Sequence, residues 1–180
     1  VEQSHNPERA EPFADRLADL APEAGHLVHM PAHIYMQVGR YHDSTLNNMR
    51  ATDADAAFVA VCRSDSPIYL AGYIPHNWHF GWVTAAIEGW RAQAFAMADG
   101  TAAQLSPELL RAPGMAVAQH FLAQPIFARV RFGAWDALLA AEAPEADLPY
   151  ARVLWHWGRG LALAATGDPA GARGEHAALE

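Results

Sequence analysis

Four glycines, each following an apolar helical segment, constrain the fold of this chain more than any other feature. They are Gly39, Gly89, Gly133 and Gly167, in the stretches VGRYHDS, EGWRAQA, FGAWDAL and TGDPAGA. Apolar residues between them recur at the three- and four-residue spacing of one helix face, and no stretch shows sustained strand alternation. Pro and Gly cluster between these segments, as expected where helices stop and start. The sequence therefore predicts an all-α fold.

The spacing of equivalent positions indicates a repeat. Ala10 to Ser44 is 34 residues, and Gly133 to Gly167 is also 34. The steps between the other glycines are longer, which implies insertions of about 16 and about 10 residues around CRSDSPIYLAG and LSPELLRAPG. A period of this length is typical of helical hairpins that stack into an array.

This pattern resembles the tetratricopeptide repeat, a helix–turn–helix unit. The match is best over residues 5–56, where Ala32 and Tyr35 occupy the small and aromatic positions of the first helix and Gly39 and Ala51 fit the turn and the second helix. The resemblance implies a right-handed superhelix of hairpins, an α-α solenoid, forming one domain over residues 1–180 that is truncated at its N-terminus. The implied units are approximately 1–22, 23–56, 73–104, 115–143 and 149–180.

A narrower resemblance rests on two motifs rich in histidine. HLVHMPAHIYMQVGRY and YIPHNWHF are similar to motifs of a bacterial group of tetratricopeptide-repeat proteins. In that group we expect a further helix rich in histidine immediately upstream. The resemblance implies a fold and the location of a site, and it implies no particular reaction.

The candidate metal ligands are His26, His29, His33, His76 and His79. His26 and His76 each lie 13 residues before their turn glycine, and His29 and His79 each lie 10 before it. His26, His29 and His33 share one helix face, because residues at i, i+3 and i+7 do so. The repeat resemblance implies that this face lines a concave groove, where neighbouring first helices bring the imidazoles together.

Further residues belong to the same hypothesis. Glu2, on the truncated first unit, and His120, 13 residues before Gly133, are possible additional ligands. Tyr73 and Asn77 flank the second histidine pair and are expected to support the ligands from behind. Isolated histidines elsewhere are better explained as polar residues of helix interfaces; these are His5, His42, His156 and His176.

Two prolines accompany the histidines. Pro31 lies inside the first histidine helix, where it is expected to bend the helix. Pro75 suits the first turn of the second histidine helix, where a missing N–H costs nothing.

Several imidazoles with one possible carboxylate suit Zn, Cu, Ni or Fe, and the sequence does not decide among these metals. A thiolate-rich zinc site is excluded because Cys62 is the only cysteine. Three functions stay open: a repeat module that binds a transition metal in its groove, a metal-dependent enzyme of hydrolytic or oxidative type, and a metal-free scaffold for a peptide or protein. The chain has no HExxH, GxSxG, P-loop or GxGxxG motif, so whether it is an enzyme is uncertain.

Charge and hydropathy limit the partners. The net charge of −8 argues against nucleic acid, which requires a basic surface. No apolar run is long enough to cross a bilayer, so no membrane partner is expected and the cytoplasm is the default, although the compartment is not identified. The groove is expected to hold a protein, a peptide or a small molecule. Self-association is expected through the N-terminal end, near Phe13 and Leu17.

Overall fold

The computed structural model describes residues 4–62 and 68–179, so the predicted ligand Glu2 lies outside the described residues. Every regular element in these two ranges is a helix, which confirms the all-α prediction. The chain divides into two compact units, Val1–Gly100 and Thr101–Glu180. The predicted repeat bounds and the single domain stay predictions.

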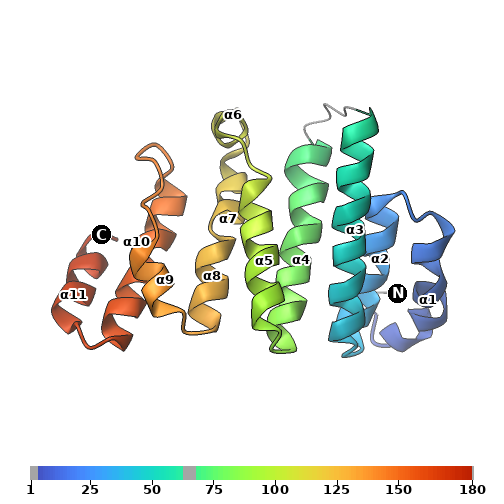
Figure 1. Ribbon diagram of the computed structural model, residues 1–180, viewed down its shortest axis with the longest axis horizontal. Coiled ribbons are helices and arrows are strands. Elements are labelled where there is room, and N and C mark those ends of the chain that lie inside the picture. Colours follow the sequence, from blue (N-terminus) through green and yellow to red (C-terminus); the bar gives the residue numbers. More distant parts are fainter. Residues whose placement is uncertain (1–3, 63–67, 180) are drawn as a thin grey trace. The chain divides into compact units, whose positions relative to one another are not determined.

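The first unit is built around a layer of antiparallel helices (Figure 1). Its elements are η1 (Pro7–Ala10), α1 (Glu11–Leu20), α2 (Gly25–Gln37), α3 (Tyr41–Cys62), η2 (Tyr69–Tyr73), α4 (Ile74–Ile87) and α5 (Arg91–Ala103), the last of which crosses into the second unit. α1 packs on α2, α2 packs on α3, and α3 packs on α4.

The four glycines of the sequence pattern end helices as predicted. All four have positive φ: 82° at Gly39, 82° at Gly89, 62° at Gly133 and 89° at Gly167. After Gly39, the N–H of Arg40 donates to the carbonyl of Tyr35 at 2.8 Å, a bond across the helix end. A left-handed residue there lets the next backbone N–H groups satisfy the last helical carbonyls, and glycine adopts this conformation without a Cβ penalty.

Small residues, some of them polar, fill the interface between α2 and α3. Ala32 and Ala51 are fully buried, and Ser44 donates from Oγ to the carbonyl oxygen of Ala32 at 3.1 Å. Gly25 lies so close to α3 that a Cβ at this position would be 1.8 Å from Oδ1 of Asp55. These short side chains let the two helices approach closely, which brings the polar face of α3 up to the histidines of α2.

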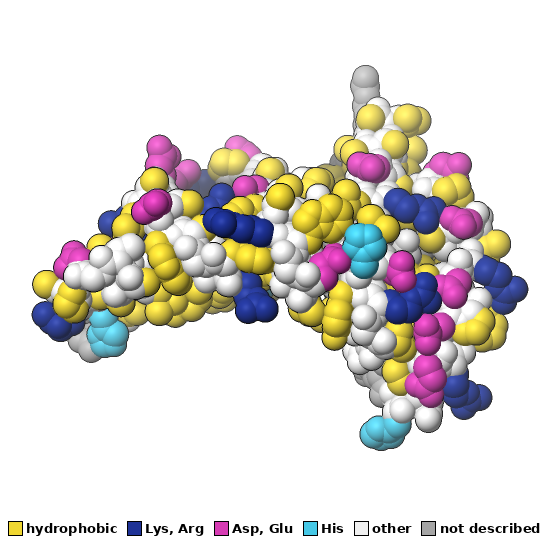
Figure 2. All heavy atoms as spheres, turned by 60° about the horizontal axis from the view of Figure 1, so that its bottom comes forward, with side chains coloured by type: hydrophobic (Ala, Val, Ile, Leu, Met, Phe, Trp, Pro, Cys, Tyr) yellow, Lys and Arg dark blue, Asp and Glu magenta, His cyan; other side chains and the backbone are white. Residues whose placement is uncertain are grey.

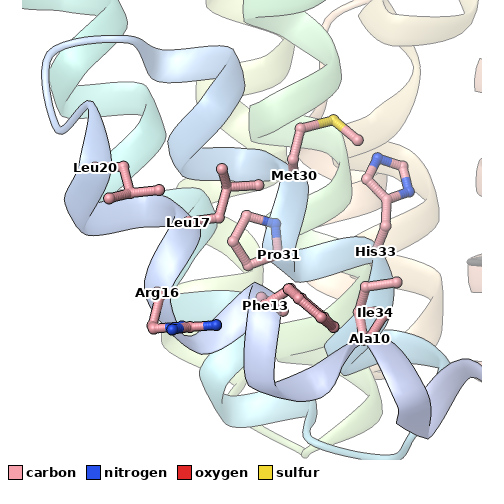
Figure 3. A pocket seen from close by; sticks show the side chains of 10 residues that line it. Ala10, Phe13, Arg16, Leu17, Leu20, Met30, Pro31, His33 and Ile34 are labelled. Atoms are coloured by element: carbon pink, nitrogen blue, oxygen red, sulfur yellow. The ribbon is translucent and has the colours of Figure 1, made fainter.

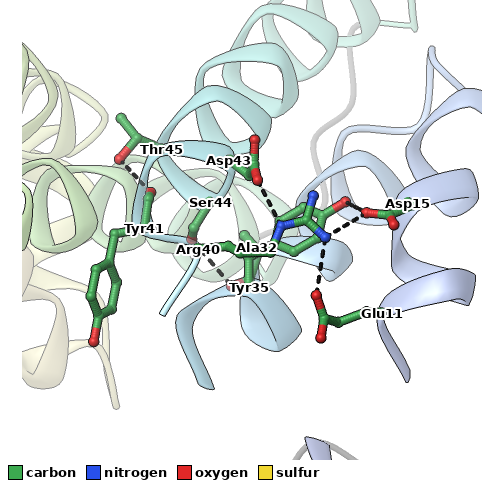
Figure 4. Close-up of polar contacts among 9 residues, drawn as sticks. All are labelled: Glu11, Asp15, Ala32, Tyr35, Arg40, Tyr41, Asp43, Ser44 and Thr45. Carbon is green, nitrogen blue, oxygen red and sulfur yellow. Dashed lines mark hydrogen bonds and ion pairs between the residues drawn. The ribbon is translucent and has the colours of Figure 1, made fainter. Parts of the chain in front are cut away.

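A charged network ties α1 to the turn after α2 (Figure 4). Arg40 donates from Nε to Asp43 at 2.7 Å and from one terminal nitrogen to Asp15 at 2.8 Å and Glu11 at 3.2 Å. The hydroxyl of Tyr35 also donates to Asp15, at 2.9 Å. Burial, followed by the bond to Asp15, raises the pKa of Tyr35 to about 12. Hydrogen bonds from Tyr35 and Arg40 lower the pKa of Asp15. This network holds α1 against α2, the helix that carries His26, His29 and His33.

The second unit contains several short helices and one long helix, α10. They are α6 (Pro107–Arg111), η3 (Ala116–Ala118), α7 (Gln119–Leu122), α8 (Gln124–Arg131), α9 (Trp135–Ala140), α10 (Pro149–Ala165) and α11 (Pro169–Ala177). Leu110, Leu148 and Ala151 belong to its hydrophobic core. α11 has no fully buried residue, and Glu175 connects it to α10 through Nδ1 of His156 at 2.6 Å and Nε of Arg159 at 2.9 Å.

The surface carries no large basic area on the side that is drawn. On the face in Figure 2, Arg side chains lie in small separate groups among hydrophobic and acidic ones. Within residues 4–62 and 68–179, no helix combines the length and the hydropathy needed to cross a bilayer.

Candidate metal centre

Three of the predicted histidines converge in the first unit. His29 and His33 come from α2, and His76 comes from α4. Nε2 of His29 lies 2.7 Å from Nε2 of His33 and 3.2 Å from Nε2 of His76. Each ring offers one ligand nitrogen, and the three nitrogens all lie within 4.8 Å of one another. This group of three could hold a metal ion.

Local helix geometry explains the meeting. His29 and His33 are four residues apart and therefore neighbours on one face of α2. Pro31 lies between them, fully enclosed, and α2 continues through it to Gln37. His76 stands in the first turn of α4 beside Pro75, which occupies one of the first two helical positions, as predicted.

Asn48 on α3 orients the central ring. Its Oδ1 is 2.7 Å from Nδ1 of His29, and both groups are fully buried. Its Nδ2 donates to the carbonyl of Ser44 at 2.8 Å, which places Oδ1 on the side of His29. An amide oxygen only accepts, so Nδ1 of His29 carries the proton and Nε2 keeps its lone pair for the cluster. A ligand histidine in a metalloprotein is commonly held in this way.

Burial keeps His29 neutral. Its side chain is fully enclosed, and desolvation is the main reason that its pKa falls to about 3. The bond to Asn48 acts in the opposite direction, and the neighbouring histidines lower the pKa further. The ring of Phe80 lies 5.3 Å from that of His29 and 4.7 Å from that of His33, which adds apolar cover. Metal ions bind neutral imidazole, so this environment favours the form that ligates.

Nε2 of His29 is shared between two neighbouring rings. The single lone pair on Nε2 of His29 faces Nε2 of both His33 and His76, and one lone pair accepts one strong hydrogen bond. A metal ion instead takes one lone pair from each ring. Zn–N bonds of about 2.0–2.1 Å at tetrahedral angles separate two ligand nitrogens by about 3.3 Å. The nitrogens of His29 and His76 are 3.2 Å apart, those of His29 and His33 are 2.7 Å apart, and all three lie within 4.8 Å of one another.

The other two predicted ligands are not part of the group of three. The ring of His26 stacks on that of His29 at 5.9 Å and lies 4.5 Å from that of Tyr73. Its Nδ1 is buried without a hydrogen-bond partner. The ring of His79 lies 6.2 Å from that of Trp82. A ligand role for His26 and His79 stays a prediction.

The additional ligands of the hypothesis lie elsewhere or are not described. Glu2 is outside the described residues. His120 belongs to the second unit, where its Nδ1 is 3.1 Å from the hydroxyl of Tyr150 and its ring lies 5.9 Å from that of Phe127. Neither position is tested as a ligand.

A buried carboxylate lies behind the histidines. Asp55 on α3 is 1% exposed and accepts from the Tyr69 hydroxyl at 2.6 Å and from the amide of Asn77 at 2.8 Å. Burial raises the pKa of Asp55, while these bonds and the nearby His26 act against that rise. Burial and the bond to Asp55 raise the pKa of Tyr69. The network fixes the start of α4 against α3, and so it positions His76 next to Asn77.

The sequence hypothesis included Asn77 and missed Asn48 and Asp55. The missed residues lie on the second helix of the hairpin, whereas the argument from offsets considered only first helices. The sequence contains a pattern that could have identified them: Ser44, Asn48, Ala51 and Asp55 lie at i, i+4, i+7 and i+11, the spacing of one helix face. Short polar residues in phase with a small buried residue indicate a polar face turned inward.

Searches of protein-family models, curated proteins and solved structures found no match to this chain. The functional argument therefore rests on the geometry of the three histidines and their supports.

Proposed function

We propose that this chain is a tetratricopeptide-like repeat module that binds one divalent transition metal ion through His29, His33 and His76. The observation that carries the proposal is the convergence of three Nε2 atoms, with the central ring buried, neutral and held by Asn48. The repeat assignment is supported by left-handed glycines that follow α2, α4, α8 and α10 at equivalent points of the sequence pattern.

The donor set limits the choice of metal. Three imidazole nitrogens suit Zn, Cu, Ni and Fe, and the group contains neither thiolate nor carboxylate. Calcium and magnesium prefer oxygen ligands and are not expected to compete.

The test begins with protein purified without a histidine tag and stripped with a chelator. Titration with Co²⁺ is expected to give one ion per chain and the visible absorption of a low-coordinate nitrogen site. Zn²⁺ is expected to displace it. His33→Ala and His76→Ala should each remove a ligand and weaken binding sharply, because a three-histidine site keeps only two protein donors.

His42→Ala is the matched control. His42 lies in the same unit, with a side chain 61% exposed and paired with Glu88, so its loss should leave metal affinity unchanged. Equal metal content in the parent, His33→Ala and His76→Ala would refute the proposal. That result would favour the metal-free scaffold, with the groove open to a peptide or protein.

One observation favours a metal-dependent enzyme as a second candidate. Catalytic zinc sites usually have three protein ligands and an open position for water, whereas structural sites have four. The group identified among the described residues has three, and His33 and His76 are only partly buried. Metal-bound water ionises near neutral pH and attacks esters or amides. Metal-dependent hydrolysis of p-nitrophenyl acetate that is lost in His76→Ala would support this role, and equal rates with and without metal would exclude it for this ester.

A further inference from the structure

A pocket adjoins the histidine cluster on the α1 side. It has a volume of about 440 Å³, within the range of small-molecule sites. Its lining is mostly apolar, with Phe13, Leu17 and Leu20 from α1 facing Met30, Pro31 and Ile34 from α2. Figure 3 shows His33 at one end of this pocket and Arg16 and Leu20 at the other.

His33 connects the pocket to the candidate metal centre. His33 is one of the residues that line the pocket, and its Nε2 lies 2.7 Å from Nε2 of His29. A molecule in this pocket would therefore have one end beside a ligand of the metal and its body among aliphatic side chains.

The charge of a bound metal ion determines which chemical group of a ligand would bind next to it. Three neutral imidazoles leave the full charge of a divalent ion uncompensated, and a charge in a partly buried site is costly unless it is paired. Among the residues that the structure describes, Asp55 is the carboxylate behind the cluster, and it is already engaged by Tyr69 and Asn77. An anion from outside the chain would supply the missing charge.

We propose that the metal centre and this pocket together bind a monocarboxylate with an apolar body, its carboxylate on the metal and its body between α1 and α2. This inference rests on the proposed metal site. A neutral ligand would leave the charge of the ion unpaired, and a short anion would leave the apolar pocket unfilled.

The experiment uses the Co²⁺-loaded protein and two probes, acetate and octanoate, titrated while the visible absorption of the cobalt is followed. Both share a carboxylate, and octanoate adds several methylenes. Each buried methylene is worth about fourfold in affinity, so octanoate is expected to bind at least about tenfold more tightly. Equal affinities for the two probes would overturn the inference.

Variants in the pocket locate the apolar body. Leu17→Gln should remove most of the preference for octanoate while acetate and Co²⁺ still bind. Leu20→Gln tests the same wall at a side chain that is 78% exposed, where folding is not at risk. Leu27→Gln is the matched control, since Leu27 lies on α2 but lines a different pocket of about 500 Å³. A preference that survives both pocket variants, or that Leu27→Gln also removes, would overturn the assignment.

The outcomes separate this inference from the metal proposal. If Co²⁺ gives no site spectrum, the proposed function fails first. If the spectrum forms but does not respond to chain length, only the further inference fails. Octanoate that binds the metal-free protein equally well and is lost in Arg16→Gln would place the carboxylate at Arg16 and refute a head group on the metal. Light scattering that shows a dimer dissociated by Leu17→Gln would assign the pocket to a second copy and also refute it.

Discussion

Acid should destabilise the metal-free protein through one buried histidine. His29 is fully enclosed and its pKa is lowered to about 3, against an ordinary value of 6.5. Between pH 6.5 and pH 3, His29 therefore binds a proton in the unfolded chain and stays neutral in the folded chain. Because the pKa is lowered on folding, the stability contributed by neutral His29 is complete above pH 6.5 and is lost as the pH falls towards 3.

The magnitude follows from the two pKa values. Well below pH 6.5 each pH unit costs about 1.4 kcal/mol for one proton, and less near pH 6.5, where the unfolded imidazole is already half protonated. The free energy of unfolding should therefore fall by roughly 2 kcal/mol between pH 6.5 and pH 4.5. Asp55 acts in the opposite direction, since burial raises its pKa and its protonation in acid favours the folded state. A comparison of the parent with His29→Gln isolates the histidine from Asp55.

Urea denaturation in the presence of a chelator, followed by tryptophan fluorescence, provides the assay. The difference in stability between the parent and His29→Gln should shrink by roughly 2 kcal/mol from pH 6.5 to pH 4.5. His42→Gln, at a side chain that is 61% exposed, is the control for replacing a histidine outside the cluster. Parallel pH curves for the parent and His29→Gln would show that His29 titrates normally, and the account of a neutral, desolvated ligand would be wrong.

Three further results are expected. Asn48→Ala, which frees the orientation of His29, should lower metal affinity by about 10–100-fold in calorimetric titration, and unchanged affinity would remove Asn48 from the site. Gly25→Ala places a Cβ 1.8 Å from Oδ1 of Asp55 and should cost about 1–3 kcal/mol in urea denaturation. Gly72→Ala, whose Cβ meets nothing closer than 3.9 Å, should cost much less; equal losses would contradict the close approach of α2 and α3. Glu175→Gln should loosen α11 from α10, seen as faster amide exchange confined to α11, and unchanged protection there would show that apolar contacts suffice.

The helical class and the helix ends were readable from the sequence. Apolar residues spaced three and four apart predict a helix, because residues at this spacing lie on the one helix face that packs against the core. Gly39 and Gly89 predict helix ends because left-handed backbone favours glycine, and both have positive φ in the structure. The three histidines that the structure brings close together, His29, His33 and His76, are all among the five predicted ligands.

The membership of the site could not be read from the same pattern. Equal offsets from the turn glycines treated His29 and His79 as equivalent, yet His29 belongs to the group of three and His79 does not. Sequence offsets give the level of a residue along its helix. They do not give the rotation of one helix about its axis relative to the next, and that rotation decides which rings meet.

The sequence by itself determined local properties: helices, their glycine ends, the proline at the start of α4, and a stripe of imidazoles on one face of α2. These depend on interactions within a few residues along the chain. Only the tertiary structure decided that Asn48 faces His29 and that Asp55 binds the amide of Asn77. It also decided that one nitrogen each of His29, His33 and His76 lie within 4.8 Å of one another. These relations depend on how closely α2, α3 and α4 pack. The distance between the helices is set by small residues such as Gly25 and Ala51, and it is known only once the helices are packed together.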